Sequence, residues 1–311
     1  MPSKSKCRLC GGDVFNADIS SGIITCVRCG QQYSMGTGKI EQPQPQPQRS
    51  TQTFPMTDTS SPSDFKIAFG VLKKYTGNSN HVVIPEGVTE IAAPDVYNRV
   101  FDHSLESIVL PKSLKVIGYQ AFESTHIKKI DVPYGVSKID RDAFRDCSVL
   151  KYVSLPSTLT EIGDNAFQKC KSLLSVEIPA SVVCIGSDAF EDCTSLQKVV
   201  FNFGLETIKE GAFHNCTSLS QVTIPDSVVS LTSSPSTYHY HSFYGCYMLT
   251  QINYPSRFSP VVFSGTAWYD HIGKAQYEME QRNKKISNGI CPDCGGKLGM
   301  FNKCKRCGKK F

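Results

Sequence analysis

Hydrophobic residues recur at a fixed interval through the middle of the chain. The segments Leu150–Ser172 (LKYVSLPSTLTEIGDNAFQKCKS) and Leu173–Ser195 (LLSVEIPASVVCIGSDAFEDCTS) place a proline, an Ile-Gly pair, an Ala-Phe pair and a cysteine at the same positions, 23 residues apart. A period of about 20 to 50 residues is typical of solenoids, in which small units stack and share one core. The pattern therefore predicts a repeat solenoid.

Each unit begins with an alternating segment. In Leu150–Pro156, hydrophobic and polar residues alternate and a proline ends the run, which predicts a short strand with one buried face. Further along, DNAFQKC is expected to form a helical turn that places Phe167 and Cys170 on one face. Stacking the strands about 4.8 Å apart builds a parallel sheet along one side. The expected fold class is an α/β repeat solenoid with one parallel sheet face.

Two columns of this pattern are expected to be buried. The aromatic column holds Phe122, Phe144, Phe167, Phe190, Phe213 and Phe243, and the column after it holds Thr125, Cys147, Cys170, Cys193, Cys216 and Cys246. Together with Cys184, these repeat cysteines are interpreted as buried free thiols that pack as small hydrophobic residues. Asn202 occupies the slot that is otherwise proline, and the last interval is longer by seven residues around Ser233–His241. That insertion is expected to be a surface loop. The loop either contributes to binding another molecule or is an insertion without a function that the fold tolerates.

Composition divides the chain into five parts. These are a cysteine module at 1–38, a linker rich in Pro, Gln and Ser at 39–63, the solenoid with an N-terminal capping hairpin at 64–265, a helix at 266–288, and a second cysteine module at 289–311. The linker has too few apolar residues to fold. The helix is expected to dock on the last unit through Trp268, Tyr269 and Ile272.

Eight cysteines form two paired C-x-x-C sets. The first set is Cys7, Cys10, Cys26 and Cys29, and the second is Cys291, Cys294, Cys304 and Cys307. Four thiolates are the closed tetrahedral donor set of structural zinc, and the glycine after each second cysteine permits the tight turn of a zinc knuckle. We expect two structural Zn²⁺ ions held in two zinc ribbons, with a cysteine-only iron site as the alternative.

Alternation along the strands also identifies a candidate binding surface. The residues expected to face outward on the sheet are Lys129, Asp131, Tyr152, Ser154, Ser175, Glu177, Lys198, Val200, Gln221, Thr223, Gln251 and Asn253. These positions vary between units, whereas a structural slot must repeat because each coil stacks on an equivalent one. A protein partner is therefore expected here, anchored by residues such as Tyr152, unless the variation is drift on a solvated face.

Charge and motifs narrow the function. The net charge of +5 combines +3 for residues 1–40 and +7 for residues 273–311 with a mildly acidic middle. The basic ends suit contact with an anionic partner such as nucleic acid, or their lysines serve only to keep small metal modules soluble. No apolar run reaches the about 18 residues of a membrane span, and no secretory signal is apparent, so we expect a cytoplasmic protein without membrane contact. No catalytic motif is present, and we expect no enzyme.

The repeated pattern L-x-x-[IV]-x-[IL]-P-x-[SG]-[LV]-x-x-I-G-x-x-A-F-x-x-C resembles the BspA-like, Treponema pallidum-type leucine-rich repeat. FKIAFGVLKKYTGNSNHVVIPEGVTEI looks like the opening unit of that family, and Phe263–Asp270 (FSGTAWYD) looks like its closing unit. The resemblance covers about 200 of 311 residues and implies a curved solenoid used for binding. Well-known members are exported adhesins. The leading hypothesis is a non-enzymatic intracellular protein-binding scaffold; the alternatives are a nucleic-acid-associated protein and a cell-surface adhesin.

Overall fold

The computed structural model describes residues 61–93, 95, 97–231, 241–299 and 302–311, together with the backbone of three strands near the N-terminus. These strands, β1 (Val14–Asp18), β2 (Ile23–Cys26) and β3 (Gln32–Ser34), form an antiparallel sheet in the order β1-β2-β3. The rest of the predicted N-terminal module, almost all of the linker and most of the insertion loop lie outside the described residues.

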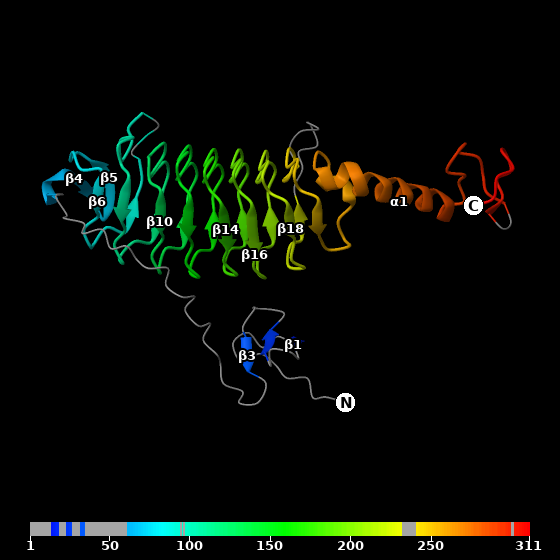
Figure 1. The fold of residues 1–311 in the computed structure, drawn as a ribbon, viewed down its shortest axis with the longest axis horizontal. Coiled ribbons are helices and arrows are strands. Elements are labelled where there is room, and N and C mark those ends of the chain that lie inside the picture. The colour runs from blue at the N-terminus through cyan, green and yellow to red at the C-terminus, as the bar shows by residue number, and fades with distance from the viewer. Residues whose placement is uncertain are drawn as a thin grey trace.

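Coils stack side by side along the long axis of the molecule (Figure 1). A six-stranded parallel sheet, here called the front sheet, contains the strands predicted from the alternating segments: β10 (Lys129–Asp131), β12 (Tyr152–Ser154), β14 (Ser175–Ile178), β16 (Lys198–Phe201), β18 (Gln221–Thr223) and β20 (Gln251–Asn253). Strands β6 (His81–Val83) and β8 (Ser107–Val109) pair in the same way before it. The predicted solenoid of stacked parallel strands is confirmed.

A second sheet, the back sheet, was not apparent in the sequence. Its nine strands are β4 (Phe65–Ala68), β5 (Val71–Tyr75), β7 (Glu90–Ile91), β9 (Val116–Ile117), β11 (Lys138–Ile139), β13 (Glu161–Ile162), β15 (Cys184–Ile185), β17 (Thr207–Ile208) and β19 (Ser230–Leu231). Strands β4 and β5 are the predicted capping hairpin, and the other neighbours in this sheet are parallel. The second residue of each strand from β7 to β17 is a fully buried isoleucine.

The segment DNAFQKC does not form the expected helical turn. Asn165 and Lys169 adopt left-handed backbone conformations, with φ of 55° and 62°. These turns direct the backbone N–H of Phe167 and of Lys169 to carbonyl oxygens of the next coil, each at 2.7 Å. The third side of each coil is therefore held by hydrogen bonds between coils, and Phe167 and Cys170 are buried as expected.

The predicted Phe column is the centre of the core. Rings of neighbouring coils from Phe101 to Phe243 stack at 5.0–5.4 Å between centroids, within 15° of parallel. Each thiol of the column Cys147–Cys246 donates a hydrogen bond to the carbonyl of the phenylalanine one coil earlier, at 3.0–3.2 Å. Cys184 differs, because it begins strand β15 and is only half-buried.

Close contact between coils explains the repeated Ile-Gly pair. A Cβ atom at Gly186 would lie 2.5 Å from the backbone nitrogen of Asp164, and one at Gly163 would lie 2.7 Å from that of Arg141. Real Cβ atoms do not approach backbone this closely, so these coils require glycine.

After the last coil, η2 (Pro260–Phe263) and a π-helical segment, η3 (Tyr269–Gly273), lead into helix α1 (Lys274–Ser287). Trp268 is buried against Tyr254 and Phe263, and Tyr269 also packs on the core. Ile272 does not dock as expected, because Gly273 is the residue that lies against Trp268 and Ile272 points to solvent. Helix α1 buries no side chain and connects the solenoid to the C-terminal module.

Candidate metal centre and binding face

The four cysteines of the C-terminal module converge. The sulfurs of Cys291, Cys294, Cys304 and Cys307 all lie within 4.8 Å of one another. The Sγ atoms of Cys291 and Cys307 are 3.7 Å apart, and those of Cys294 and Cys304 are 3.5 Å apart. Four sulfurs about 2.3 Å from a tetrahedral zinc ion would be separated by about 3.8 Å, so this donor set fits the ion.

Two matching turns position these thiols. Gly295 and Gly308, which follow the second cysteine of each pair, have φ of 68° and 75° and donate their N–H groups to the carbonyls of Cys291 and Cys304 at 3.0 Å. A left-handed residue at this point is favourable only for glycine. Both C-x-x-C-G segments therefore form the same knuckle.

Backbone donors favour the thiolate form at Cys304. The N–H groups of Cys307 and Arg306 point to its sulfur at 3.4 and 3.3 Å and lower the pKa of this thiol to about 6. A thiolate is the form that binds a metal ion. In the first predicted set, only the backbone of Cys26 belongs to the described residues, and Cys7, Cys10 and Cys29 lie outside them.

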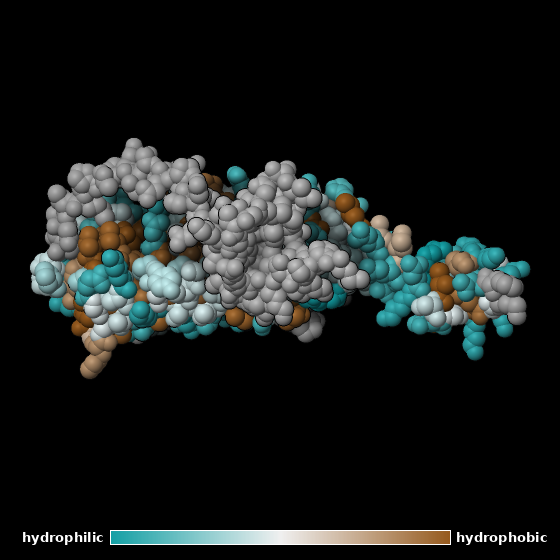
Figure 2. Space-filling model, turned by 90° about the horizontal axis from the view of Figure 1, so that it is seen from below, coloured by the Kyte–Doolittle hydropathy of each residue, from teal (hydrophilic) through white to brown (hydrophobic). Residues whose placement is uncertain are grey.

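The C-terminal module is basic and is attached to helix α1. Arg282 pairs with Asp293 at 3.3 Å and lies 5.2 Å from the centre of the Phe311 ring, while Lys309 approaches Asp293 at 2.7 Å. The exposed cations of this module are Lys297, Lys303, Lys305, Arg306, Lys309 and Lys310. Figure 2 shows mainly hydrophilic residues along the helix and a mixture of hydrophilic and hydrophobic residues on the module.

The front sheet presents the twelve predicted outward positions on one face. Eleven are exposed, and Val200 is partly exposed. The first outward column is Lys129, Tyr152, Ser175, Lys198, Gln221 and Gln251, which are aligned in that order by strand register. The second is Asp131, Ser154, Glu177, Val200, Thr223 and Asn253. Tyr152 is 45% exposed, so its ring is available to a partner.

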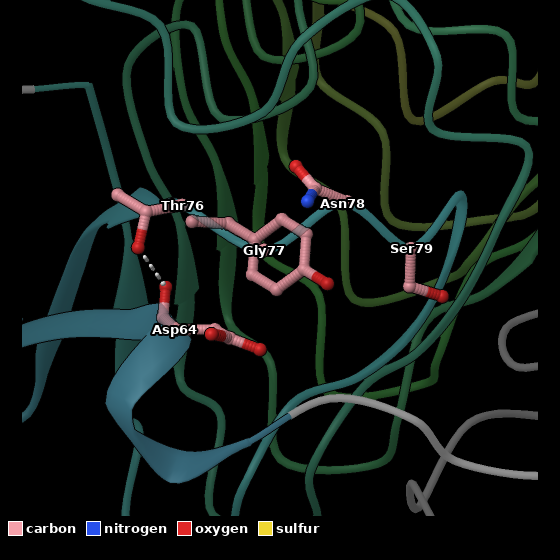
Figure 3. A pocket seen from close by; sticks show the side chains of 6 residues that line it. Asp64, Thr76, Gly77, Asn78 and Ser79 are labelled. Carbon is pink, nitrogen blue, oxygen red and sulfur yellow. Dashed lines mark hydrogen bonds between the residues drawn. The ribbon is translucent and has the colours of Figure 1, made fainter.

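A polar depression of about 440 Å³ lies at the N-terminal cap (Figure 3). It is lined by Asp64 and residues 75–79, and the Thr76 hydroxyl donates to the Asp64 carbonyl oxygen at 3.1 Å. Its ionisable side chains are Asp64 and Tyr75.

A family model for the BspA type leucine-rich repeat region matches residues 73–197 and 160–290, with six copies. The matched ranges together cover well over half of the chain. The chain belongs to the BspA-type leucine-rich-repeat family. A search of curated proteins finds no significant match.

Solved structures similar to this BspA-type chain share modest identity. A leucine-rich-repeat protein of T. pallidum is 26% identical, with a TM-score of 0.47 over 62% of this chain and 81% of that one. A leucine-rich-repeat protein from Bacteroides ovatus is 23% identical, with a TM-score of 0.45 over 60% of this chain and 58% of that one. The pneumococcal vaccine antigen PcpA is 20% identical, with a TM-score of 0.38 over 61% of this chain and 47% of that one.

One feature of the front sheet of this BspA-type solenoid was not recognised from the sequence. A depression of about 410 Å³ opens beside strand β14 and is lined by Val153, Ser154, Leu155, Ser157, Glu177, Pro179, Ala180 and Asn202. The signal that could have located it is the replacement of the repeated proline by Asn202. Within the described residues, no helix combines the length and the apolar character needed to cross a membrane.

Proposed function

We propose that this chain is a non-enzymatic intracellular scaffold that binds a protein partner through the outward face of the front sheet. The observation that carries the proposal is that the outward positions differ between coils whose buried positions repeat. Buried slots are constrained by the equivalent slot of the next coil, whereas the outward side chains of the front sheet are free of that constraint. A long, regular and chemically varied face is the surface by which repeat proteins generally bind other molecules.

Capture of the partner tests this proposal. Full-length protein is compared with the double variant Tyr152→Ala and Lys198→Glu in affinity purification from the cells that make it, with bound proteins quantified by mass spectrometry. The matched control is Tyr97→Ala with Lys115→Glu, two exposed residues outside the front sheet. We expect capture to be lost only in the first variant, with unchanged melting temperature and zinc content. Equal capture by both variants would contradict a front-sheet interface.

We also propose that structural zinc binds at both ends of the chain, one ion per four-cysteine set. The C-terminal sulfur geometry and the identical C-x-x-C pairing of the first set support this. Metal binding supplies much of the folding free energy of such small modules, so chelation should unfold the ends and leave the solenoid folded. Elemental analysis should give two zinc ions per chain, and one after Cys294→Ser. One ion or none in the unaltered chain would contradict the proposal.

The proposed location is the cytoplasm, because clustered C-x-x-C thiols and a column of free thiols suit a reducing compartment. Fractionation of the source cells tests this. Recovery of the protein at the cell surface would favour the adhesin hypothesis instead.

The basic C-terminal module favours one second candidate, which is contact with nucleic acid. Its six exposed cations face a single acidic residue, Asp293, which is already paired. Phosphate contact by these residues requires binding that weakens steeply with added salt. Fluorescence anisotropy with a labelled single-stranded oligonucleotide measures this, and Lys303→Glu with Lys310→Glu should abolish it while partner capture by the front sheet persists.

A further inference from the structure

A depression lies on the front sheet beside β12 and β14. These strands pair only at Tyr152 and Ser175, as β16 and β18 pair only at Lys198 and Gln221, whereas β14 and β16 pair over four residues. Val153 and Leu155 are only partly buried and form an apolar floor for the depression described above. Ser157 and Ala180, the small residues after the prolines of these two coils, also line it and leave it open.

A single carboxylate lies in this depression. The side-chain amide of Asn202 donates to Glu177 Oε1 at 3.1 Å and to the carbonyl oxygen of Ile178 at 3.0 Å, which fixes the amide between the two coils. A proline, which fills this slot in the other coils, has no such donor. Asn202 thereby orients the Glu177 carboxylate at the edge of the apolar floor.

The carboxylate has no cationic partner within the described part of the chain. The other acidic residue among the outward positions, Asp131, is paired with Lys129 at 2.8 Å, but no Lys or Arg nitrogen lies within 4.0 Å of Glu177 in those residues. An oriented and unneutralised carboxylate beside apolar surface complements a side chain with an apolar stem and a cationic end.

Arginine matches this arrangement better than lysine. Its three-methylene stem can cover Val153 and Leu155, and its planar guanidinium presents paired N–H donors to a carboxylate, with further donors for the hydroxyls of Ser154 and Ser157. We propose that the depression between β12 and β14 is a pocket for an arginine side chain of the partner protein, with Glu177 as its counter-charge and Asn202 as the positioning residue. This inference rests on the proposed protein-binding function of the front sheet.

The test uses N-acetyl-arginine amide as the probe and ¹⁵N-labelled full-length protein. Backbone amide shifts of Ser154, Ser157 and Ala180 should change saturably, and N-acetyl-norleucine amide should bind about tenfold more weakly because it lacks the charge-assisted hydrogen bonds. Glu177→Gln should reduce arginine affinity by about tenfold. The control variant Glu206→Gln, at an exposed glutamate outside the front sheet, should not.

Several results would overturn the assignment. Absence of saturable shifts at these amides, equal binding of the norleucine probe, or unaltered affinity of Glu177→Gln would each exclude a charge-dependent arginine pocket. Equal binding of N-acetyl-lysine amide would overturn the choice of arginine. If partner capture depends on Tyr152 and Lys198 but not on Glu177, only the arginine pocket fails. If capture survives changes at all three, the proposed front-sheet interface fails.

Discussion

Removing one ring from the middle of the Phe column tests whether the solenoid has a single continuous core. Phe167 is fully buried, and its ring stacks at 5.0 Å on Phe144 and at 5.1 Å on Phe190, within 6° of parallel. Truncation of a buried phenylalanine usually costs about 3–5 kcal/mol. Because both faces of the ring are covered and the coils on either side are held by hydrogen bonds between coils, the cavity cannot easily collapse. We therefore expect Phe167→Ala to lose about 4–5 kcal/mol.

The chain contains its own probe for this measurement. Trp268 is the one tryptophan, and it is buried against the last coil, so its fluorescence reports unfolding at the C-terminal end of the solenoid. Urea titration followed by Trp268 fluorescence and by far-UV circular dichroism should show coincident transitions, both shifted to lower urea in Phe167→Ala. The control Lys171→Ala changes an exposed residue of the same coil and should change the free energy of unfolding by no more than about 0.5 kcal/mol.

Two outcomes would refute the reasoning. Equal urea midpoints for Phe167→Ala and Lys171→Ala would show that the Phe column is not the core. If Phe167→Ala shifted the dichroism transition and left the Trp268 fluorescence transition unchanged, coils near Phe167 would unfold without those near Trp268, and the core would not be cooperative over its length.

Three further predictions follow from individual contacts. Gly186→Ala should cost at least about 2 kcal/mol, because its Cβ would lie 2.5 Å from the backbone nitrogen of Asp164, and an unchanged urea midpoint would exclude this close contact. Phe69→Asn should raise the free energy of unfolding by about 0.5–1 kcal/mol, since Phe69 is fully exposed with φ of 52° in a two-residue hairpin turn that suits Asn-Gly; a lower midpoint would contradict this. The Glu191 carboxylate accepts a hydrogen bond from His214, which raises the pKa of that imidazole and lowers the pKa of Glu191. The stabilisation by this pair is therefore lost as pH rises through the raised pKa of His214. In urea titrations, His214→Gln should lower the free energy of unfolding more at pH 5.5 than at pH 8, by up to about 1 kcal/mol. An equal loss at both pH values would exclude the charged pair.

The 23-residue period was sufficient to predict the buried columns and the front strands. The equivalents of Phe167 and Cys170 return in successive units with the same neighbours, Thr125 replacing the cysteine once, so their inward orientation follows from stacking. The back sheet could not be recognised in this way. Each of its strands from β7 onward has two residues, and from β7 to β17 one of them is a buried isoleucine such as Ile162. A two-residue strand is too short for alternation to be visible.

The conformation around the Phe column was predicted wrongly because the spacing is ambiguous. Cys170 lies three positions after Phe167, a spacing that fits one face of a helical turn and also fits a turn with left-handed residues on both sides. The decisive signal was the enrichment of Asn, Asp and Gly at the slots of Asn165 and Lys169, since these residue types tolerate positive φ.

The candidate sites also differ in whether they depend on residues close together in the sequence or on contacts between coils. Convergence of Cys291 and Cys304 with their partners was predictable, because C-x-x-C spacing and the following glycine define each knuckle within a few residues. The depression beside Glu177 depends on a contact with Asn202, 25 residues later in the chain, and on small residues such as Ala180 in the neighbouring coil. Such contacts between coils depend on how two units stack, which the sequence of one unit does not reveal.

Contacts between coils also explain why the outward positions of the front sheet can vary from coil to coil. On the back sheet, Gly163 and Gly186 lie so close to the preceding coil that a side chain at either position would strike its backbone. On the third side, left-handed residues such as Asn165 restrict each unit to a few residue types. Outward positions of the front sheet, such as Tyr152, carry neither restriction, because strand pairing uses only the backbone and the side chain meets solvent. Variation there costs little stability, and this tolerance supports the proposed binding role of the face.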